Sequence, residues 1–111
     1  MTQALDELAG RVRDYYAPRI TTIEKRMFGG IAFMVHGNMA VAPVRDGTMM
    51  VRVGKDAMPA HLKRPGCRQM EMQGRKMGGF VEVDGDVMED DDTLAFWLEA
   101  GLAFTLTLPP K

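Results

Sequence analysis

Residues 26–40 read RMFGGIAFMVHGNMA, and this stretch decides what kind of sheet the chain can form. Two apolar runs, 31–35 and 39–44, flank the turn at 36–38, where a glycine and an asparagine tolerate the positive φ that a tight hairpin requires. The Asp-Gly pair at 46–47 predicts a second hairpin turn, which leads into a third strand. The sequence therefore predicts an antiparallel three-stranded meander.

The glycine pair at 29–30 could either bind a ligand or shape the backbone. Nucleotide-binding fingerprints need a longer glycine pattern that ends at a helix N-terminus, whereas an apolar strand pattern follows this pair. Glycine within a strand more often marks a bend, a bulge or a close approach of two backbones. We therefore expect Gly29 and Gly30 to serve the architecture of the hairpin.

An amphipathic helix is expected before the meander. Its apolar residues recur at spacings of three and four: Leu5, Leu8, Val12 and Tyr15. Thr2 is expected to cap the start of this helix, and the helix should end before Pro18. The segment 20–28 has β propensity and connects the helix to the meander.

The rest of the chain is expected to complete an α+β fold. The predicted elements are, in order, a strand over 49–53, a short helix over 57–62 capped by Asp56, a strand around 70–72, a strand over 80–84, and a final helix that begins near Asp91 or Asp92 and ends before Pro109. The final helix carries a broad apolar stripe: Leu94, Trp97, Leu98, Phe104 and Leu108. The sequence thus predicts one two-layer α+β domain over residues 1–111, with an antiparallel sheet, in the order helix, three strands, helix, two strands, helix.

The length and composition suit a single globular domain, with 111 residues of which 46% are hydrophobic and 26% are charged. The one cysteine, Cys67, cannot form an intramolecular disulfide, and the N-terminus lacks the basic start and the apolar run of a secretory signal. No apolar run approaches the roughly 20 residues that cross a bilayer. We therefore expect a cytoplasmic protein without membrane contact.

The charge distribution is more informative than the net charge of −1. Basic residues concentrate in 52–76, whereas 77–110 contains no lysine or arginine and is rich in acidic residues. These stretches could form a basic and an acidic surface that orient a partner, or they could both be ordinary solvated faces. Because 14 basic residues are outnumbered by 15 acidic ones and no helix is distinctly basic, we expect no direct sequence-specific DNA binding.

The residue patterns that support catalysis or metal binding are weak in this chain. Cys67 and His61 lie close in sequence, but no third residue that would orient the histidine is evident. A zinc site built from these two residues and His36 lacks the paired short spacings of structural zinc. The acidic run 84–92 lacks a ligand and the turn glycine of a calcium loop. The sequence therefore predicts no catalytic residue, no metal site and no cofactor, and it indicates that the protein is not an enzyme.

Two further features concern the strands. The chain has 11 methionines, and those in strand patterns are expected to fill gaps in a core, with an adaptable binding surface and a Cu(I) site at Met70 and Met72 as alternatives. Arg52 lies within the apolar strand 49–53, so its charge must reach solvent or find a partner. An outward-facing position explains such an arginine more often than a ligand does.

The chain resembles the N-terminal domain of the TfoX/Sxy family. The segments that carry the resemblance occur in the order RMFGGIAFMVHGNMA, MMVRVG, RPGCRQM, GRKMGGFVEVD, LAFWLEAGLAF and LPPK, and they cover the chain from about Arg26 onward. The family's motif residues correspond here to Met27, Phe28, Gly29, Gly30, Arg52, Arg64, Pro65, Gly66, Met77, Phe80 and Trp97. The resemblance implies a two-layer α+β fold and no catalytic or metal role for these residues.

Family members with a second, C-terminal domain are regulators of natural competence that act with a cyclic-AMP receptor protein at promoters. This sequence ends at Lys111 without that domain, so we expect a stand-alone domain. The resemblance implies a non-enzymatic interaction domain that co-regulates transcription through a protein partner, such as the transcription machinery. The alternative is an effector-binding domain with a cleft near Met27–Gly30 and Arg52. An apolar cleft with Arg52 turned inward favours this alternative.

The final helix also predicts self-association. Its apolar residues occupy more than one face, and Phe96 and Ala103 lie off the stripe that a single sheet would cover. Exposed apolar surface of this kind often marks an interface. We expect a symmetric homodimer through this helix or a sheet edge, unless the first helix covers these residues.

Overall fold

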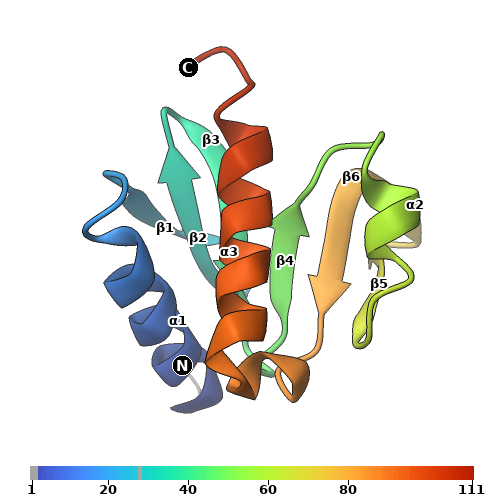
Figure 1. The fold of residues 1–111 in the computed structure, drawn as a ribbon, viewed down its shortest axis with the longest axis horizontal. Coiled ribbons are helices and arrows are strands. Elements are labelled where there is room, and N and C mark those ends of the chain that lie inside the picture. Colours follow the sequence, from blue (N-terminus) through green and yellow to red (C-terminus); the bar gives the residue numbers. More distant parts are fainter. Residues whose placement is uncertain (1–2, 28) are drawn as a thin grey trace.

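The computed structural model describes residues 3–27 and 29–111, and it confirms the predicted α+β class. The elements are α1 (Gln3–Tyr16), β1 (Ile23–Met27), β2 (Gly30–Val35), β3 (Asn38–Pro43), β4 (Met49–Arg52), α2 (Met58–His61), β5 (Cys67–Met72), β6 (Arg75–Val83), the short 3-10 helix η1 (Val87–Glu89) and α3 (Asp91–Thr105) (Figure 1). The strands form one antiparallel sheet in the spatial order β1-β2-β3-β4-β6-β5. No described helix is long and apolar enough to cross a bilayer.

The helices α1 and α3 cover the same face of the sheet, with α3 lying over β3 and β4 (Figure 1). The main core lies between these layers, and its largest fully buried side chains include Trp97, Tyr16 and Phe33. The Tyr16 hydroxyl donates a 2.8 Å hydrogen bond to the carbonyl oxygen of Leu98, which joins α1 to α3 inside the core. The small helix α2 lies beside β5 and β6.

The strand count before the second helix differs from the expectation, because four strands precede α2 rather than three. The additional strand is β1, which pairs antiparallel with β2. Every residue of β1 is exposed, including Ile23 at 63%. This strand is held by backbone pairing with β2 and by the ion pair of Glu24 with Arg13 of α1. Because it has no buried face, it lacks the apolar alternation by which strands are recognised in a sequence.

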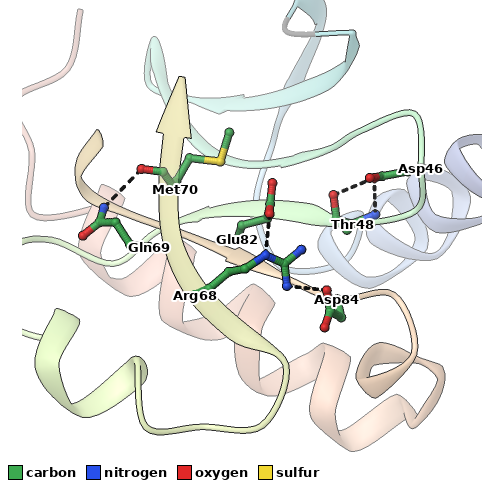
Figure 2. Close-up of polar contacts among 7 residues, drawn as sticks. All are labelled: Asp46, Thr48, Arg68, Gln69, Met70, Glu82 and Asp84. Carbon is green, nitrogen blue, oxygen red and sulfur yellow. Dashed lines mark hydrogen bonds and ion pairs between the residues drawn. The ribbon is translucent and has the colours of Figure 1, made fainter. Parts of the chain in front are cut away.

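The hairpins that the sequence predicted are present. The turn before β4 is held by Asp46, whose carboxylate accepts hydrogen bonds from the backbone amide of Thr48 at 3.1 Å and from its hydroxyl at 2.7 Å (Figure 2). These bonds lower the pKa of Asp46. The glycine that follows it, Gly47, has a φ of +87°, as a tight turn requires.

The predicted start of the final helix near Asp91 is confirmed, whereas two predicted helix caps and the predicted end of that helix are wrong. The N-cap of α2 is Ala57, without a side-chain hydrogen bond, so Asp56 is not the cap. The N-cap of α3 is Asp90, one residue before the predicted position, and it accepts hydrogen bonds from the amide and hydroxyl of Thr93. Helix α3 ends at Thr105, so Leu108 follows the helix and does not extend its apolar stripe. The predicted cap Thr2 lies outside the described residues.

The glycine pair at 29–30 has the predicted architectural role. Gly29 has a φ of +73°, in the left-handed region that favours glycine, and the space around it is open. Gly30 forms a bridge with Val44, and a Cβ atom on Gly30 would overlap the carbonyl oxygen of Pro43 and lie 2.8 Å from the Cα atom of Val44. Glycine at position 30 therefore allows two backbones to pack directly against each other.

The opposite face of the sheet carries a second apolar cluster, which we call the methionine face. It consists of Ala32, Met34, Met39, Ala42, Val44, Met50, Met70, Met72, Met77 and Phe80. The described helices lie on the other side of the sheet (Figure 1), yet Met50 is fully buried and Met39 and Met70 are nearly so. Core filling, the predicted role for methionine, is confirmed for these three residues. The flexible thioether side chains cover this face largely by packing on one another.

Candidate binding cleft

A cleft of about 590 Å³ opens at the end of β4, within the 300–1,000 Å³ range typical of ligand pockets. Its lining comes from three parts of the chain: the loop between β4 and α2, the middle of β6, and the segment at the C-terminal end of α3. The lining residues are Arg52, Val53, Gly54, Lys55, Asp56, Ala57, Gly78, Gly79, Phe80, Phe104, Thr107 and Leu108. We call this site the Arg52 cleft.

A bulge in β6 forms one wall of the cleft. Between Lys76 and Val81, residues 77–80 of β6 oppose only Met70 of β5, so the register of the pair shifts there. The side-chain amide of Gln69 stabilises the bulge by donating hydrogen bonds to the carbonyl oxygens of β6 residues 77 and 80 at 2.9 and 3.4 Å. It also lies 3.2 Å from the carbonyl oxygen of Met70, the contact drawn in Figure 2. An amide side chain thereby satisfies carbonyls that the irregular ladder leaves unpaired.

Gly79 connects the bulge to the neighbouring elements. Its carbonyl oxygen accepts hydrogen bonds from the amides of Val53 and Gly54 at 2.9 and 3.0 Å, and its own amide donates to the sulfur of Met58 at 3.0 Å. Gly54 has a φ of +83°, and a Cβ atom on it would lie 2.6 Å from an atom of the Phe104 ring. Because these groups hold one another in place, the cleft is formed before any ligand arrives.

Arg52 is the cation that faces this cleft. It lies opposite Phe80 in the sheet, and its guanidinium carbon is 5.1 Å from the centre of the Phe80 ring. One of its nitrogens donates a long hydrogen bond of 3.4 Å to the carbonyl oxygen of Met39. Burial lowers the pKa of Arg52, and no carboxylate of residues 3–27 and 29–111 lies within ion-pair distance of it. The cleft lining therefore contains a partly desolvated cation that has no ion-pair partner among the described residues.

The rest of the lining is a mixture of charge and apolar surface. Lys55 lies along Gly78, where a Cβ atom would be 2.9 Å from the Cε atom of the lysine. Asp56 is the one carboxylate of the lining, so the formal charge of the lining is positive. The apolar lining residues include Phe80 of β6 and Phe104 of α3. Such a lining suits a ligand with one anionic group and an apolar body.

The predicted combination of Met27–Gly30 with Arg52 in one cleft is wrong for the described residues. Gly29 lines a different hollow of about 390 Å³, together with residues of the turn before β4. Gly30 bridges to Val44 at the Met49 end of β4, whereas Arg52 ends that strand. Of the family motif residues, Arg52 and Phe80 line the Arg52 cleft and Met77 lies in the bulge beside it. Phe28 lies outside the described residues.

Another group of motif residues gathers where α2 meets α3. Arg64, Pro65 and Trp97 line a hollow of about 520 Å³, and the Arg64 guanidinium lies 3.8 Å from the centre of the Phe96 ring. The ring of His61 is 5.2 Å from that of Trp97. Gly66 packs against a valine of η1, where a Cβ atom on the glycine would approach two methyl groups at 2.9 Å. These residues pack the end of the sheet against α3.

This packing corrects the expectation about Phe96. Phe96 is half-buried, because Arg64 and His61 cover its ring from the side of α2 rather than from α1. Ala103 is exposed as expected, and the nearby Leu106 is 46% exposed. The homodimer stays a prediction, and the exposed apolar residues nearest to it are Ala103 of α3 and Leu106, which follows the helix.

The basic and acidic stretches of the sequence meet directly in the sheet. Arg68 of β5 donates to Glu82 of β6 at 2.8 Å and also pairs with Asp84 (Figure 2). These pairs raise the pKa of Arg68. At this position the two stretches neutralise each other and do not form separate charged surfaces.

His61 and Cys67 show no catalytic arrangement. The Nδ1 atom of His61 is buried and has no hydrogen-bond partner among the described residues, and burial and the nearby Arg64 lower the pKa of His61. Burial raises the pKa of Cys67 to about 11, which disfavours the thiolate. No group of three or more His, Cys, Asp or Glu side chains in the described part of the chain is placed to hold a metal ion.

We therefore expect Cys67 to react slowly with alkylating reagents in the folded protein. The rise of its pKa from 9.0 to about 11 should slow labelling near pH 8 by about 100-fold relative to the unfolded chain, because only the thiolate reacts. Iodoacetamide labelling followed by mass spectrometry, with and without denaturant, measures the ratio. Equal rates in the two states would show that the fold does not suppress the thiolate of Cys67.

The chain forms a small α+β domain with a cleft whose lining carries a positive formal charge. A family model described as the TfoX N-terminal domain matches residues 14–105, and the chain belongs to this family. Searches among curated proteins and among solved structures gave no match.

The sequence identified Arg52 and Phe80 but not the other residues of the cleft. Lys55, Phe104 and Thr107 were missed because they come from different elements, and only the folded chain brings them together. One local signal was available. The Gly78-Gly79 pair interrupts a strand pattern, and glycine in a strand often marks a bulge.

Proposed function

We propose that the protein is a non-enzymatic cytoplasmic binding domain whose Arg52 cleft takes up a small-molecule effector. The observation that carries this proposal is the position of Arg52, a partly buried cation that lines a cleft and has no carboxylate partner among the described residues. An unpaired cation costs folding free energy unless it gains a partner. A bound anionic group would supply that partner.

A second candidate is a protein-interaction domain that co-regulates transcription through a protein partner. Membership of the TfoX N-terminal domain family supports this candidate, because relatives with a second domain regulate competence. The charge distribution supports it less than the sequence suggested, since Arg68 is already paired with Glu82 and Asp84. Direct sequence-specific DNA binding is part of neither proposal.

Ligand screening by protein-observed NMR tests the first candidate. A fragment library of mixed charge should include compounds that shift the amide signals of the cleft residues. Thr107→Trp should abolish these shifts, because Thr107 is exposed and lines the cleft, so the large side chain can occupy the cleft without entering the core.

Thr21→Trp is the matched control, because Thr21 is also an exposed threonine but lies in the loop between α1 and β1. Binding should persist in this variant. No binding by any fragment, or binding that survives Thr107→Trp, would reject the cleft as an effector site.

Affinity capture from native lysate tests the second candidate. The bait is the whole chain, and the comparison is a double charge reversal, Arg75→Glu with Lys76→Glu, at exposed positions of β6 outside the cleft. Recovery of transcription proteins that is lost on charge reversal would favour the interaction domain. Recovery that is unaffected by the reversal would count against a role for the basic stretch.

A further inference from the structure

The charge pattern of the Arg52 cleft restricts the class of ligand, given the proposed effector-binding function on which this inference rests. Two cations, Arg52 and Lys55, face one carboxylate, Asp56. Neither cation has an ion-pair partner among the described residues. A single negative charge on the ligand would pair with Arg52, while Asp56 would repel a second one.

Three backbone amides of the cleft lining are already used by hydrogen bonds within the protein. Phosphate sites in loops use several free backbone amides that converge on the anion. Here the amides of Val53 and Gly54 donate to Gly79, and the amide of Gly79 donates to the sulfur of Met58. These three amides are therefore not free to bind an anion, whereas the Arg52 guanidinium matches the two oxygens of a carboxylate.

The apolar part of the cleft calls for a substantial ligand body. The rings of Phe80 and Phe104 and the side chains of Val53, Ala57 and Leu108 line it. A volume of about 590 Å³ exceeds what a small inorganic anion fills. Flat rings and branched aliphatic groups pack well against such a lining, because aromatic side chains offer large rigid surfaces.

We propose that the Arg52 cleft binds an apolar monocarboxylate, with the carboxylate on the Arg52 guanidinium and the apolar body between Phe80 and Phe104. The bulge of β6 contributes Gly78, Gly79 and Phe80 to the lining of this site. The amide of Gln69 holds the bulge and is a positioning group without ligand contact.

The test uses three probes that share one ring system: 2-naphthoate, 2-naphthamide and 2-naphthyl phosphate. Calorimetry or NMR titration of the whole chain measures their affinities. We expect the carboxylate to bind about tenfold more tightly than the neutral amide, the size of one charge-assisted hydrogen-bond pair, and more tightly than the phosphate. Arg52→Met should bring the carboxylate and the amide to within about twofold of each other.

Each departure from this pattern has a distinct meaning. Equal binding of carboxylate and amide to the wild type, or tighter binding of the phosphate, would overturn the monocarboxylate proposal and leave the effector site in place. If none of the three probes binds but library fragments do bind the cleft, the monocarboxylate proposal is also overturned and the effector site remains. Failure of the probes and of the library together would reject the effector function itself.

A second variant keeps the test decisive if Arg52→Met does not fold. Lys55 is exposed, so Lys55→Met should leave the fold intact and should weaken carboxylate binding without changing amide binding. The loss should be smaller than for Arg52, because an exposed charge is screened by water and salt. An unchanged preference for the carboxylate over the amide in Lys55→Met would contradict the assigned anion position.

Discussion

Gly30→Ala is expected to lower the free energy of unfolding by about 3 kcal/mol, because the new methyl group has no space. It would overlap the carbonyl oxygen of Pro43 and lie 2.8 Å from the Cα atom of Val44. Both are backbone atoms, so the clash cannot be relieved by turning a side chain. Relief requires the start of β2 to move away from the end of β3, which also breaks the bridge between Gly30 and Val44.

Gly29→Ala is the matched control for this effect. The space around Gly29 is open, and the cost comes only from its φ of +73°, which an alanine adopts at about 1 kcal/mol. Denaturant titration followed by far-ultraviolet circular dichroism compares the two variants. Equal losses, or a larger loss at Gly29, would show that the close approach of the two backbones is not what position 30 requires.

Trp97→Ala should cost about 4 kcal/mol, near the upper end for a single side chain. Trp97 is 1% exposed and belongs to the main core between α3 and the sheet. Its ring centre lies 5.2 Å from those of His61 and Phe96. The truncation leaves a cavity at the junction of α2 and α3, and since domains of this size have about 5–15 kcal/mol of stability, a large part of it would be lost.

Phe96→Ala provides the comparison on the same helix. Phe96 is half-buried, so its truncation removes less apolar surface from the interior and should cost about half as much. Circular dichroism is the suitable probe, because the chain has a single tryptophan and the variant has none. A loss for Trp97→Ala no larger than that for Phe96→Ala would mean that the contacts of Trp97 do not organise this junction.

An element of this fold was predictable from the sequence where its signals lie within a few residues of one another. The hairpins around β2, β3 and β4 were predictable because apolar alternation and turn residues occur within a few positions of one another. The strand β1 was missed as a separate element because its residues IEKRM are all exposed. β1 is held by pairing with β2 and by the ion pair of Glu24 with Arg13, and neither contact leaves an apolar pattern in the sequence.

The cleft was also difficult to predict, because its residues lie far apart in the sequence. Arg52 was recognisable because a charge within an apolar strand needs an explanation. Its partners in the cleft were not recognisable, since Phe104 and Lys55 lie almost 50 positions apart in the sequence. The error of placing Gly29 and Gly30 beside Arg52 arose because the register of the strands between them was unknown. The structure puts Gly30 at the Met49 end of β4 and Arg52 at the other end.

The bulge in β6 also interrupts the pairing of β5 with β6, and so it separates the tip of this hairpin from its base. Toward the turn at 73–74, only Glu71 with Lys76 and Met72 with Arg75 remain paired, beyond the interruption at 77–80. Few hydrogen bonds must break to open this tip, so its local unfolding costs less free energy than that of the hairpin base. Opening would expose part of the methionine face while α1 and α3 stay packed. Amide hydrogen exchange is therefore expected to be faster at the tip of the hairpin than at its base. The tip would open and uncover the helix-free face of the sheet while the main core stays closed.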